Sequence, residues 1–353
     1  MTFAEARALF PVLETVAFLN AGTFGPLARP VADALADGFE RDLLQGRSGL
    51  PYFEETMGLR EELRASFATL VDAEPAQIAL TSSTTEGCGI AVRGLGLRPE
   101  DEIVTTTDEH FGLLGALAVS GAQVVVVAPE PEAILAAVTP RTRLIASSQV
   151  LWTTGAVLPL AELRAEAGIP VLADGAQSVG AVPAAAAGVD FLTISGQKWL
   201  CGPDATGALV VTDPERHSAT SPSYFSQREY DPDGSFVPQP GGRRFEAGWW
   251  ARGTARAMLT ALDLRPAWWH ERASAAAKRC RELLGGRVEL VVPDAASTLV
   301  AFRPRDGDPA ALVARLYAEG VHVRDIPGRG LVRVSCGWWT SDEDLDRLVA
   351  ALG

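Results

Sequence analysis

The size, composition and charge of the chain exclude several classes of protein. Its 353 residues are 47% hydrophobic and carry a formal net charge of −13 at pH 7, so the chain can bury a large core, as two domains or as one domain with an appendage. A chain this acidic lacks the basic face that nucleic acid and anionic lipid require, which leaves small molecules as the expected ligands.

The N-terminal part of the chain predicts a turn and two helices. Residues 18–26 form a turn rich in glycine and proline that contains Asn20 and Thr23. A helix follows, because Val31, Leu35 and Phe39 recur at helical spacing. A second amphipathic helix is expected over residues 53–70.

Short apolar strands then alternate with helical or loop-forming stretches. This alternation predicts an α/β fold in which a mostly parallel sheet is covered by helices on both faces. Ligands of such sheets bind beyond the carboxyl ends of the strands, where this chain places polar clusters such as SSTTEG, TTDEH, DGAQ and SGQK. The expected strands lie near residues 80, 104, 125, 145, 172 and 192.

The second half of the chain differs in composition. Residues 218–242 are polar, aromatic and rich in proline and glycine, which indicates an ordered loop over a site or subunit contact, or a flexible surface loop. A helix over residues 254–284 leads to an α+β region whose last helix has Ser341 as its N-cap. We therefore expect an N-terminal segment (1–17), a large domain (18–262) and a small C-terminal domain (263–353) that includes the N-terminal segment.

The sequence predicts no metal site and no membrane span. The cysteines are scattered, show no CxxC spacing and stand apart from the four histidines. Residues 1–17 are charged and interrupted by proline, unlike a signal peptide, and no apolar run reaches the roughly 20 residues that a membrane span needs. These features favour a cytoplasmic protein with reduced thiols. The cysteines are Cys88, Cys201, Cys280 and Cys336.

Lys198 and Asp174 are the first candidates for catalysis. The chain has only two lysines, Lys198 and Lys278, so a lysine just past the end of an apolar strand, beside Trp199, indicates chemistry. Partial desolvation lowers the pKa of an amine there and makes it a nucleophile toward an aldehyde. Asp174 ends the preceding strand, where its carboxylate would hold the protonated ring nitrogen of pyridoxal, cap the following turn, or do both.

Further polar residues surround this pair in the predicted sheet. Thr84 and Thr85 stand at a predicted helix N-terminus, which is a cradle for phosphate, although the same SSTTE pattern is also an ordinary capping box. Ser195 and Gln197 add candidate phosphate contacts beside the lysine. Gln177, one short turn after the acid, is placed to donate a hydrogen bond to a phenolic oxygen.

His110 and Arg333 each have two interpretations. His110 ends a strand and either stacks on a pyridine face or has a structural role. Arg333 is flanked by apolar strand residues, so its guanidinium needs an anion if it is buried. That anion is either a substrate carboxylate, bound as a bidentate fork, or an internal acid in a salt bridge.

Six motifs of the chain together resemble the class V aminotransferase family of fold-type I pyridoxal-phosphate enzymes. In order they are TSSTTEG, DEHFG, DGAQSVG, SGQKWLCGPDATG, RRFEAG and LVRVSCGWWTSDEDLDRL. The family includes cysteine desulfurases, cystine C–S lyases and isopenicillin-N-epimerase-like proteins. The resemblance extends from about residue 18 to residue 352, and the pairing of DGAQ with SGxKW is highly specific. It implies the fold-type I architecture, a large domain with a helix-flanked sheet and a smaller C-terminal α+β domain.

The resemblance also implies a role for each candidate residue and a homodimer with the site at the interface. Lys198 would form the Schiff base with pyridoxal 5'-phosphate, Asp174 would face the pyridinium nitrogen, and His110 would stack on the ring. Arg333, helped by Asn20, would bind the substrate carboxylate. The remaining cofactor contacts would be Gln177 at the phenolic oxygen and Thr84, Thr85, Ser195 and Gln197 at the phosphate.

Three departures from the family pattern bear on the reaction. Desulfurases carry a nucleophilic cysteine shortly before the carboxylate arginine, whereas this chain has VRDIPGRGL. Relatives often follow RFExG with a threonine that reaches the partner subunit's phosphate, whereas here Gly248 precedes Trp249 and Trp250, which line an interface or a substrate pocket, or simply pack. Many relatives have an SHV motif where Ser148 and Gln149 stand here.

The sequence therefore predicts a homodimeric pyridoxal-phosphate enzyme that acts on an amino acid through an external aldimine and a quinonoid. We expect β-elimination from a cysteine-type or S-substituted cysteine substrate, which is a C–S lyase reaction. An aminotransferase or an epimerase of a specialised biosynthetic amino acid is the alternative. A cysteine desulfurase, or a binding protein that keeps the fold without turnover, ranks below both.

Overall fold

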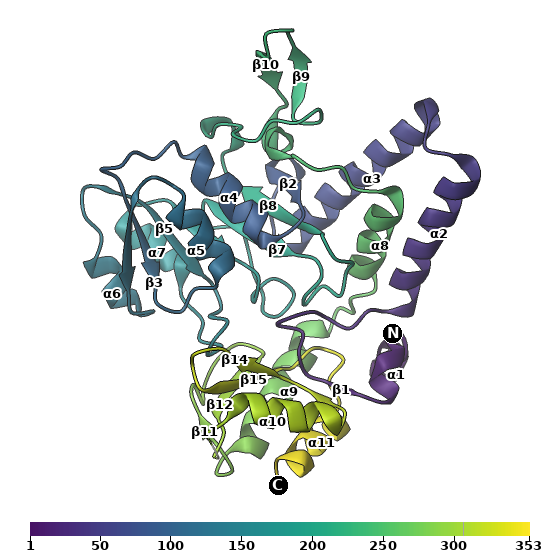
Figure 1. The fold of residues 1–353 in the computed structure, drawn as a ribbon, viewed down its shortest axis with the longest axis vertical. Coiled ribbons are helices and arrows are strands. Elements are labelled where there is room, and N and C mark those ends of the chain that lie inside the picture. The colour runs from purple at the N-terminus through teal and green to yellow at the C-terminus, as the bar shows by residue number, and fades with distance from the viewer. Residues whose placement is uncertain (306) are drawn as a thin grey trace.

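A seven-stranded sheet organises the larger part of the molecule, which the computed structural model describes over residues 1–305 and 307–353 (Figure 1). Its central strands run parallel, as predicted, because short runs of valine, isoleucine and leucine are buried on both faces. The strands lie in the order β2 (Ile78–Thr81), β8 (Gly207–Val211), β7 (Phe191–Ser195), β6 (Val171–Asp174), β5 (Thr142–Ser148), β3 (Glu102–Thr106) and β4 (Gln123–Val127).

Strand β8 corrects the prediction, which has no strand at residues 207–211. It runs antiparallel to both of its neighbours, β7 and β2. Antiparallel strands need no helical crossover, and β8 follows the SGQK loop without an intervening helix. The strand–helix alternation that revealed the other strands therefore does not extend to it.

The two faces of this sheet pack into separate apolar cores. Along β5, Ile145 points into one core, whereas Leu144 and Ala146 point into the other, with the period of two that a strand requires. Helix α4 contributes to the second core, and helices α3 and α8 contribute to the first. The helices of this part are α2 (Arg29–Gln45), α3 (Gly49–Leu70), α4 (Thr84–Gly94), α5 (Phe111–Ala118), α6 (Pro131–Ala136), α7 (Leu160–Ala167) and α8 (Arg252–Asp263).

Two predicted helical patterns differ from the structure in detail. Helix α2 buries Val31, but Phe39 on the same predicted stripe is 62% exposed. The single helix expected over residues 254–284 is instead two helices, α8 and α9 (Trp269–Leu284). The chain leaves the helical path around Pro266, whose ring removes a backbone N–H.

A four-stranded antiparallel sheet with three helices forms the C-terminal part (Figure 1). The N-terminal chain joins it, because β1 (Ala17–Phe18) pairs with β13 (Val321–His322) and Leu19 enters the same apolar core. Ser341 caps the last helix, as predicted, by accepting a hydrogen bond from the backbone N–H of Asp344. The domain boundary at residue 262 stays a prediction. The other elements are α1 (Phe3–Ala8), β11 (Glu289–Leu290), β12 (Leu299–Arg303), β15 (Leu331–Ser335), β14 (Arg324–Ile326), α10 (Pro309–Ala318) and α11 (Asp342–Leu352).

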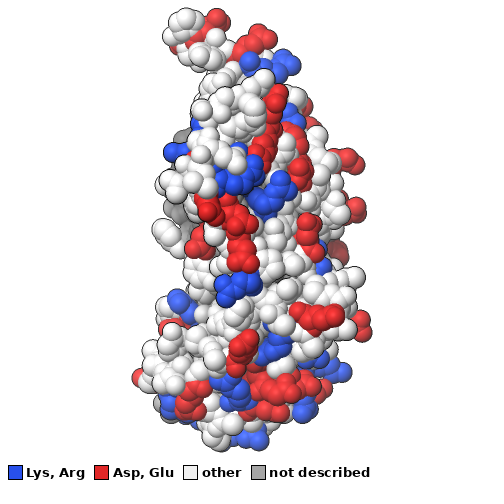
Figure 2. Space-filling model, turned by 90° about the vertical axis from the view of Figure 1, so that its right-hand side faces the viewer, with Lys and Arg blue, Asp and Glu red and all other residues white. Residues whose placement is uncertain are grey.

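Residues 218–242 contain more regular secondary structure than the ordered or flexible loop that the sequence predicts. They contain an antiparallel hairpin of β9 (Gln227–Tyr230) and β10 (Phe236–Pro238), which projects from one end of the molecule (Figure 1). On the face shown in Figure 2, acidic and basic side chains intermingle along the long axis. Within residues 1–305 and 307–353, no helix is long and apolar enough to cross a membrane.

Candidate active site

Lys198 lies three residues beyond the carboxyl end of β7, the strand that pairs in parallel with β6, which ends at Asp174. Desolvation lowers the pKa of its amine to about 8, while Asp174 opposes this shift and Arg333 adds to it. The pKa of His110 is lowered mainly by burial, and it too responds to the charges of Lys198, Asp174 and Arg333. Lys198 and His110 therefore both lie within reach of the charges of Asp174 and Arg333, although the four residues come from four separate segments of the chain.

Asp174 is held with one carboxylate oxygen free of protein hydrogen bonds. The residue is 3% exposed, and Oδ1 accepts from the backbone N–H of Ala176 at 3.0 Å and from Thr193 Oγ1 at 3.1 Å. The bond to Ala176 is the predicted cap of the turn. Oδ2 accepts no hydrogen bond from the residues that the structure describes, so it is available to a donor from a ligand. Thr193 was not identified in the sequence, although the pairing of β6 with β7 places it beside this acid.

Gln177 connects the cluster to the N-terminal turn. Its Nε2 donates to the carbonyl oxygen of Gly22 at 2.8 Å, and its Oε1 accepts from Trp199 Nε1 at 3.1 Å. One N–H of the amide is left over for a further acceptor. The side chain is 4% exposed, so these bonds hold it in one orientation.

Two glycines let the N-terminal turn approach the site closely. The N–H of Gly25 donates to the carbonyl oxygen of Gln197 at 2.8 Å, and a Cβ on Gly25 would lie 2.1 Å from the carbonyl oxygen of Lys198. A Cβ on Gly22 would lie 2.6 Å from Arg333 Nη2. Only glycine fits at such distances, so residues 20–25 are packed between the lysine and the arginine.

Arg333 is a buried cation without an acidic partner among the described residues. It is 2% exposed, Nη1 donates to the carbonyl oxygen of Trp152 at 2.8 Å, and Nε has no partner. Desolvation lowers its pKa to about 10, and the charge of Arg324 adds to the shift. The antiparallel register sets Arg324 directly opposite Arg333. The internal salt bridge that was one interpretation of Arg333 is absent among the described residues, so its buried charge has no opposite charge beside it.

The Asn20 side chain forms no hydrogen bond with this arginine among the described residues. Its backbone forms a bridge with Ser335, two residues along the strand from Arg333. Its Oδ1 accepts from Thr23 Oγ1 at 2.8 Å. The N–H of Gly22 donates to Ser335 Oγ at 3.1 Å, which fixes the turn against β15.

Thr84 and Thr85 begin helix α4, where unpaired N–H groups and the helix dipole favour an anion. The N-cap is Ser83, whose Oγ accepts from the N–H of Glu86 at 3.2 Å, so the capping interaction is also present. A Cβ on Gly112 would lie 2.6 Å from Thr85 Oγ1, which brings the N-terminus of α5 against that of α4. On the other side of the cluster, the Ser195 hydroxyl donates to Gln197 Oε1 at 2.9 Å.

His110 is the N-cap of α5, because its Nδ1 accepts from the N–H of Gly112 at 3.1 Å. Its ring packs edge to face against Trp152, with the ring centroids 5.2 Å apart. Accepting at Nδ1 with a lowered pKa is the behaviour of a neutral imidazole. The structural role is therefore present, and the residue is exposed.

Glu109 is a buried carboxylate that the sequence reasoning missed, although it stands in the TTDEH cluster. Its two oxygens accept from Thr106 Oγ1 and Ser147 Oγ, at 2.7 and 2.6 Å, and from the N–H and hydroxyl of Ser148, at 2.9 and 2.6 Å. Burial raises its pKa, and the four donors oppose this. Because Ser148 pairs with Asp174 across the sheet, this network braces the strand ends behind the cofactor candidates.

The two tryptophans after the RRFEAG motif have different environments. Trp250 is 5% exposed and belongs to the main apolar core. Trp249 is 41% exposed and packs against Phe225, with the ring centroids 4.9 Å apart, and against Tyr52. Simple packing accounts for Trp250, whereas Trp249 belongs to a surface aromatic cluster.

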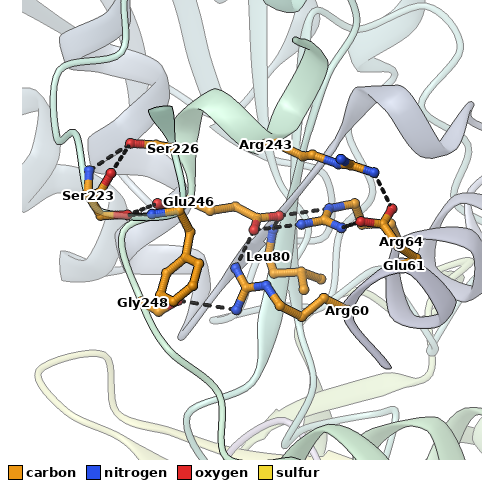
Figure 3. Close-up of polar contacts among 10 residues, drawn as sticks. Arg60, Glu61, Arg64, Leu80, Ser223, Ser226, Arg243, Glu246 and Gly248 are labelled. Carbon is orange, nitrogen blue, oxygen red and sulfur yellow. Dashed lines mark hydrogen bonds and ion pairs between the residues drawn. The ribbon is translucent and has the colours of Figure 1, made fainter. Parts of the chain in front are cut away.

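Glu246 of the same motif anchors this segment through a buried ionic cluster (Figure 3). Arg64 donates to it from Nε and Nη2 at 2.9 and 2.7 Å, the N–H of Leu80 donates at 3.0 Å, and Arg60 donates through Nη2. Arg60 also donates to the carbonyl oxygen of Gly248 at 3.3 Å. Helix α3 and strand β2 thus fix the backbone that carries Trp249.

The chain is similar over its whole length to proteins of known chemistry. A family described as aminotransferase class-V matches residues 17–348. The isopenicillin N epimerase of Streptomyces clavuligerus is 29% identical over 391 residues, covering 99% of this chain and 97% of the relative. A solved complex of the cystine C–S lyase C-DES with its reaction product cysteine persulfide is 26% identical, with a TM-score of 0.91 over 97% of this chain and 98% of that one. A C-DES mutant with glycine covalently linked to its PLP cofactor is 25% identical, with a TM-score of 0.91 over 98% of each chain.

Proposed function

The chain belongs to the class-V aminotransferase family of pyridoxal-phosphate-dependent enzymes, and from that premise we propose that it eliminates a sulfur substituent from the β-carbon of an amino acid. One observation carries the amino-acid chemistry: a desolvated amine, a carboxylate with a free oxygen and a buried guanidinium without an acid converge on one cluster. They are Lys198, Asp174 and Arg333. A base, a cofactor anchor and a carboxylate-binding group are what such a reaction requires.

The residues of this cluster fit pyridoxal phosphate. Asp174 Oδ2 would accept from the ring nitrogen, His110 would lie against the ring, and the N-terminus of α4 with Thr84 and Thr85 would hold the phosphate. When bound, the cofactor supplies an electron sink for negative charge at the substrate α-carbon. Further contacts would come from Gln177, Ser195 and Gln197.

The roles of the protein groups follow from their charges. Arg333 binds the substrate carboxylate through the N–H groups that the carbonyl oxygen of Trp152 leaves free. Lys198 Nζ, in its neutral form, removes the α-proton. The Cβ–S bond then breaks, the sulfur leaves with the bonding electrons, and the protonated Lys198 returns the proton to it. The released 2-aminoacrylate reacts with water to give pyruvate and ammonia.

The state of the cysteines favours elimination over desulfuration. Desulfuration by a protein nucleophile needs an accessible thiolate, and the four cysteines are all buried. Burial is the main reason that the pKa values of Cys88 and Cys201 are raised. The segment from Arg324 to Leu331 contains no cysteine. The similarity to C-DES supports the same reaction class.

An epimerase is the second candidate, because the relative from Streptomyces clavuligerus matches nearly the whole chain. The two reactions diverge after the α-proton is removed, so their products separate them. The holoenzyme is incubated in deuterated water with cystine, S-substituted cysteines and cysteine, and pyruvate, chirality and α-deuterium are measured. Pyruvate that disappears in Lys198→Ala supports elimination. Inversion with α-deuterium and without pyruvate would identify an epimerase, and a keto acid with the original carbon skeleton would identify an aminotransferase.

We extend the proposal to a homodimer, because large apolar side chains are exposed where α2 leads into α3. Exposed apolar side chains in such a group are typical of a surface that a partner covers. Light scattering after size exclusion tests this, and Leu43→Glu is expected to give monomers. A wild-type monomer at micromolar concentration would contradict the proposal. The exposed fractions are 62% for Phe39, 82% for Leu43, 74% for Leu44, 66% for Leu50 and 41% for Phe53.

A further inference from the structure

A cavity of about 290 Å³ lies at the turn between α8 and α9, apart from the cluster around Lys198. One wall is apolar and is formed by the end of α3 and the segment after β6. The other wall carries Arg265 and Trp269. The apolar wall includes Leu70, Val179, Val182, Pro183 and Ala184.

Arg265 brings an unpaired positive charge to this cavity. Its Nη1 is buried without a hydrogen-bond partner, and no acid forms an ion pair with it among residues 1–305 and 307–353. Burial alone lowers its pKa, with no opposing contribution from a carboxylate. The guanidinium instead lies over the ring of Trp269, 4.8 Å from its centroid. The residue is half-buried, and a cation–π contact of this kind contributes only about 0.5–2 kcal/mol, so an anion would stabilise the guanidinium further.

We propose that this cavity binds a small carboxylic acid with an apolar body. The carboxylate would pair with the Arg265 guanidinium, which presents a fork of N–H donors of matching geometry. The hydrocarbon part would fill the apolar wall, as in small ligand pockets lined mainly by aliphatic and aromatic groups with few polar anchors. A phosphate fits less well, because a dianion needs more donors than one guanidinium and the remaining wall is apolar.

The cavity is separate from the cofactor cluster but shares a chain segment with it. No residue of its lining is among those proposed to hold the cofactor or the substrate. Val179 follows Gln177 by two residues, and the backbone of Gly180 packs on Trp199, because a Cβ there would lie 3.0 Å from Trp199 Cβ. Binding of an acid in this cavity therefore does not depend on which reaction the enzyme catalyses.

Fluorine NMR on the holoenzyme tests the site with 4-(trifluoromethyl)benzoate as the probe and 4-(trifluoromethyl)benzamide as its neutral match. We expect saturable binding of the benzoate and none of the benzamide. Arg265→Met keeps the side-chain length but removes the charge, and is expected to weaken binding by about tenfold or more. Ala184→Leu keeps the charge of Arg265 but fills part of the cavity beside the apolar wall, so it is expected to weaken binding as well. Arg279→Met, at an exposed arginine of α9, is the matched control and should bind as the wild type does.

Two further measurements separate this site from the carboxylate site of the enzyme. Benzoate binding should persist in Arg333→Met, and its loss there but not in Arg265→Met would mean that the probe occupies the substrate site, which overturns the inference. Absence of saturation below roughly 1 mM in the wild type also overturns it. Since Arg265 forms no ion pair with the described residues and its contact with Trp269 is weak, Arg265→Met should lower the melting temperature by only a few degrees. A fall of many degrees would show that the charge has a structural partner.

Discussion

Arg333→Met gives the sharpest test of the proposed substrate site. The substitution keeps most of the side-chain volume and removes a guanidinium that is 2% exposed and lacks an acid. If that guanidinium binds the substrate carboxylate, its removal lowers the stability of the fold only slightly. Substrate binding then loses a charge-assisted hydrogen-bonded pair. The expected result is therefore a large functional loss with a small stability loss, since only the hydrogen bond to the carbonyl oxygen of Trp152 is removed from the fold.

The magnitude follows from the donors that remain free. Nη1 is shared with the carbonyl oxygen of Trp152, while Nε has no partner. A bidentate contact comprises two hydrogen bonds to a charged group, each contributing about 1.5–3 kcal/mol. Together they contribute about 3–6 kcal/mol, and their loss corresponds to a rise in KM of roughly 10²- to 10⁴-fold.

The dependence of kcat on pH is a second measurement, and it would stay unchanged if Arg333 had only a structural role. Arg333 contributes to the lowered pKa of Lys198, so its removal favours the ammonium form and raises that pKa. The rise of kcat with pH should shift to higher pH in Arg333→Met.

The assay measures KM, kcat against pH, cofactor absorbance and melting temperature. Arg303→Met, on the neighbouring strand with a side chain 50% exposed, is the control and should behave as the wild type does. An unchanged KM, or loss of the bound cofactor, would refute the assignment of Arg333 to the substrate carboxylate.

Three other perturbations test the site and its support. In the wild type, kcat should rise as the pH increases through about 8, because the neutral amine of Lys198 is the base, and a profile that is flat there would contradict this role. Gly25→Ala would place a Cβ 2.1 Å from the carbonyl oxygen of Lys198, so kcat should fall; Gly58→Ala, where no atom lies within 4 Å, is the control and should leave it unchanged. Glu246→Gln leaves the buried Arg60 without a carboxylate and leaves Arg64 with the exposed Glu61 alone, so urea denaturation should show a loss of about 3–5 kcal/mol. A loss below about 1 kcal/mol would mean that the cluster relaxes around the amide.

The sequence predicted the parallel strands of the sheet and a group of polar residues at their carboxyl ends, because both depend on local patterns. Runs of β-branched residues mark buried strands, and polar residues directly after them mark strand ends. Asp174 ends β6 and Ser195 ends β7, and the carboxyl ends of parallel strands meet at one edge of a sheet. Residues far apart in the chain were therefore expected to lie close together in space, without any knowledge of tertiary contacts.

Contacts that depend on register or on distant segments were not predictable in this way. Arg324 faces Arg333 only because of the antiparallel pairing of β14 with β15. Glu109 collects its donors from β3 and β5, and the glycines of the N-terminal turn are needed only because that turn packs on Lys198. Pro266 could have marked the break between α8 and α9, since proline removes a helical hydrogen bond.

The fate of the substrate after proton removal depends on loops, and one of them shows how this chain differs from desulfurases. The segment that carries their nucleophilic cysteine contains Arg329 here. Its guanidinium lies 3.1 Å from Asp108 Oδ1 and donates to the carbonyl oxygen of Thr107, just beyond the end of β3. Asp108 in turn accepts from Thr153 Oγ1 at 2.8 Å, next to Trp152, whose carbonyl oxygen binds Arg333. A salt bridge therefore ties this segment to the loops around the substrate carboxylate, where a desulfurase needs a thiolate free to reach the sulfur. Without that acceptor we expect the sulfur to leave with the electrons of the Cβ–S bond, as in the elimination proposed above.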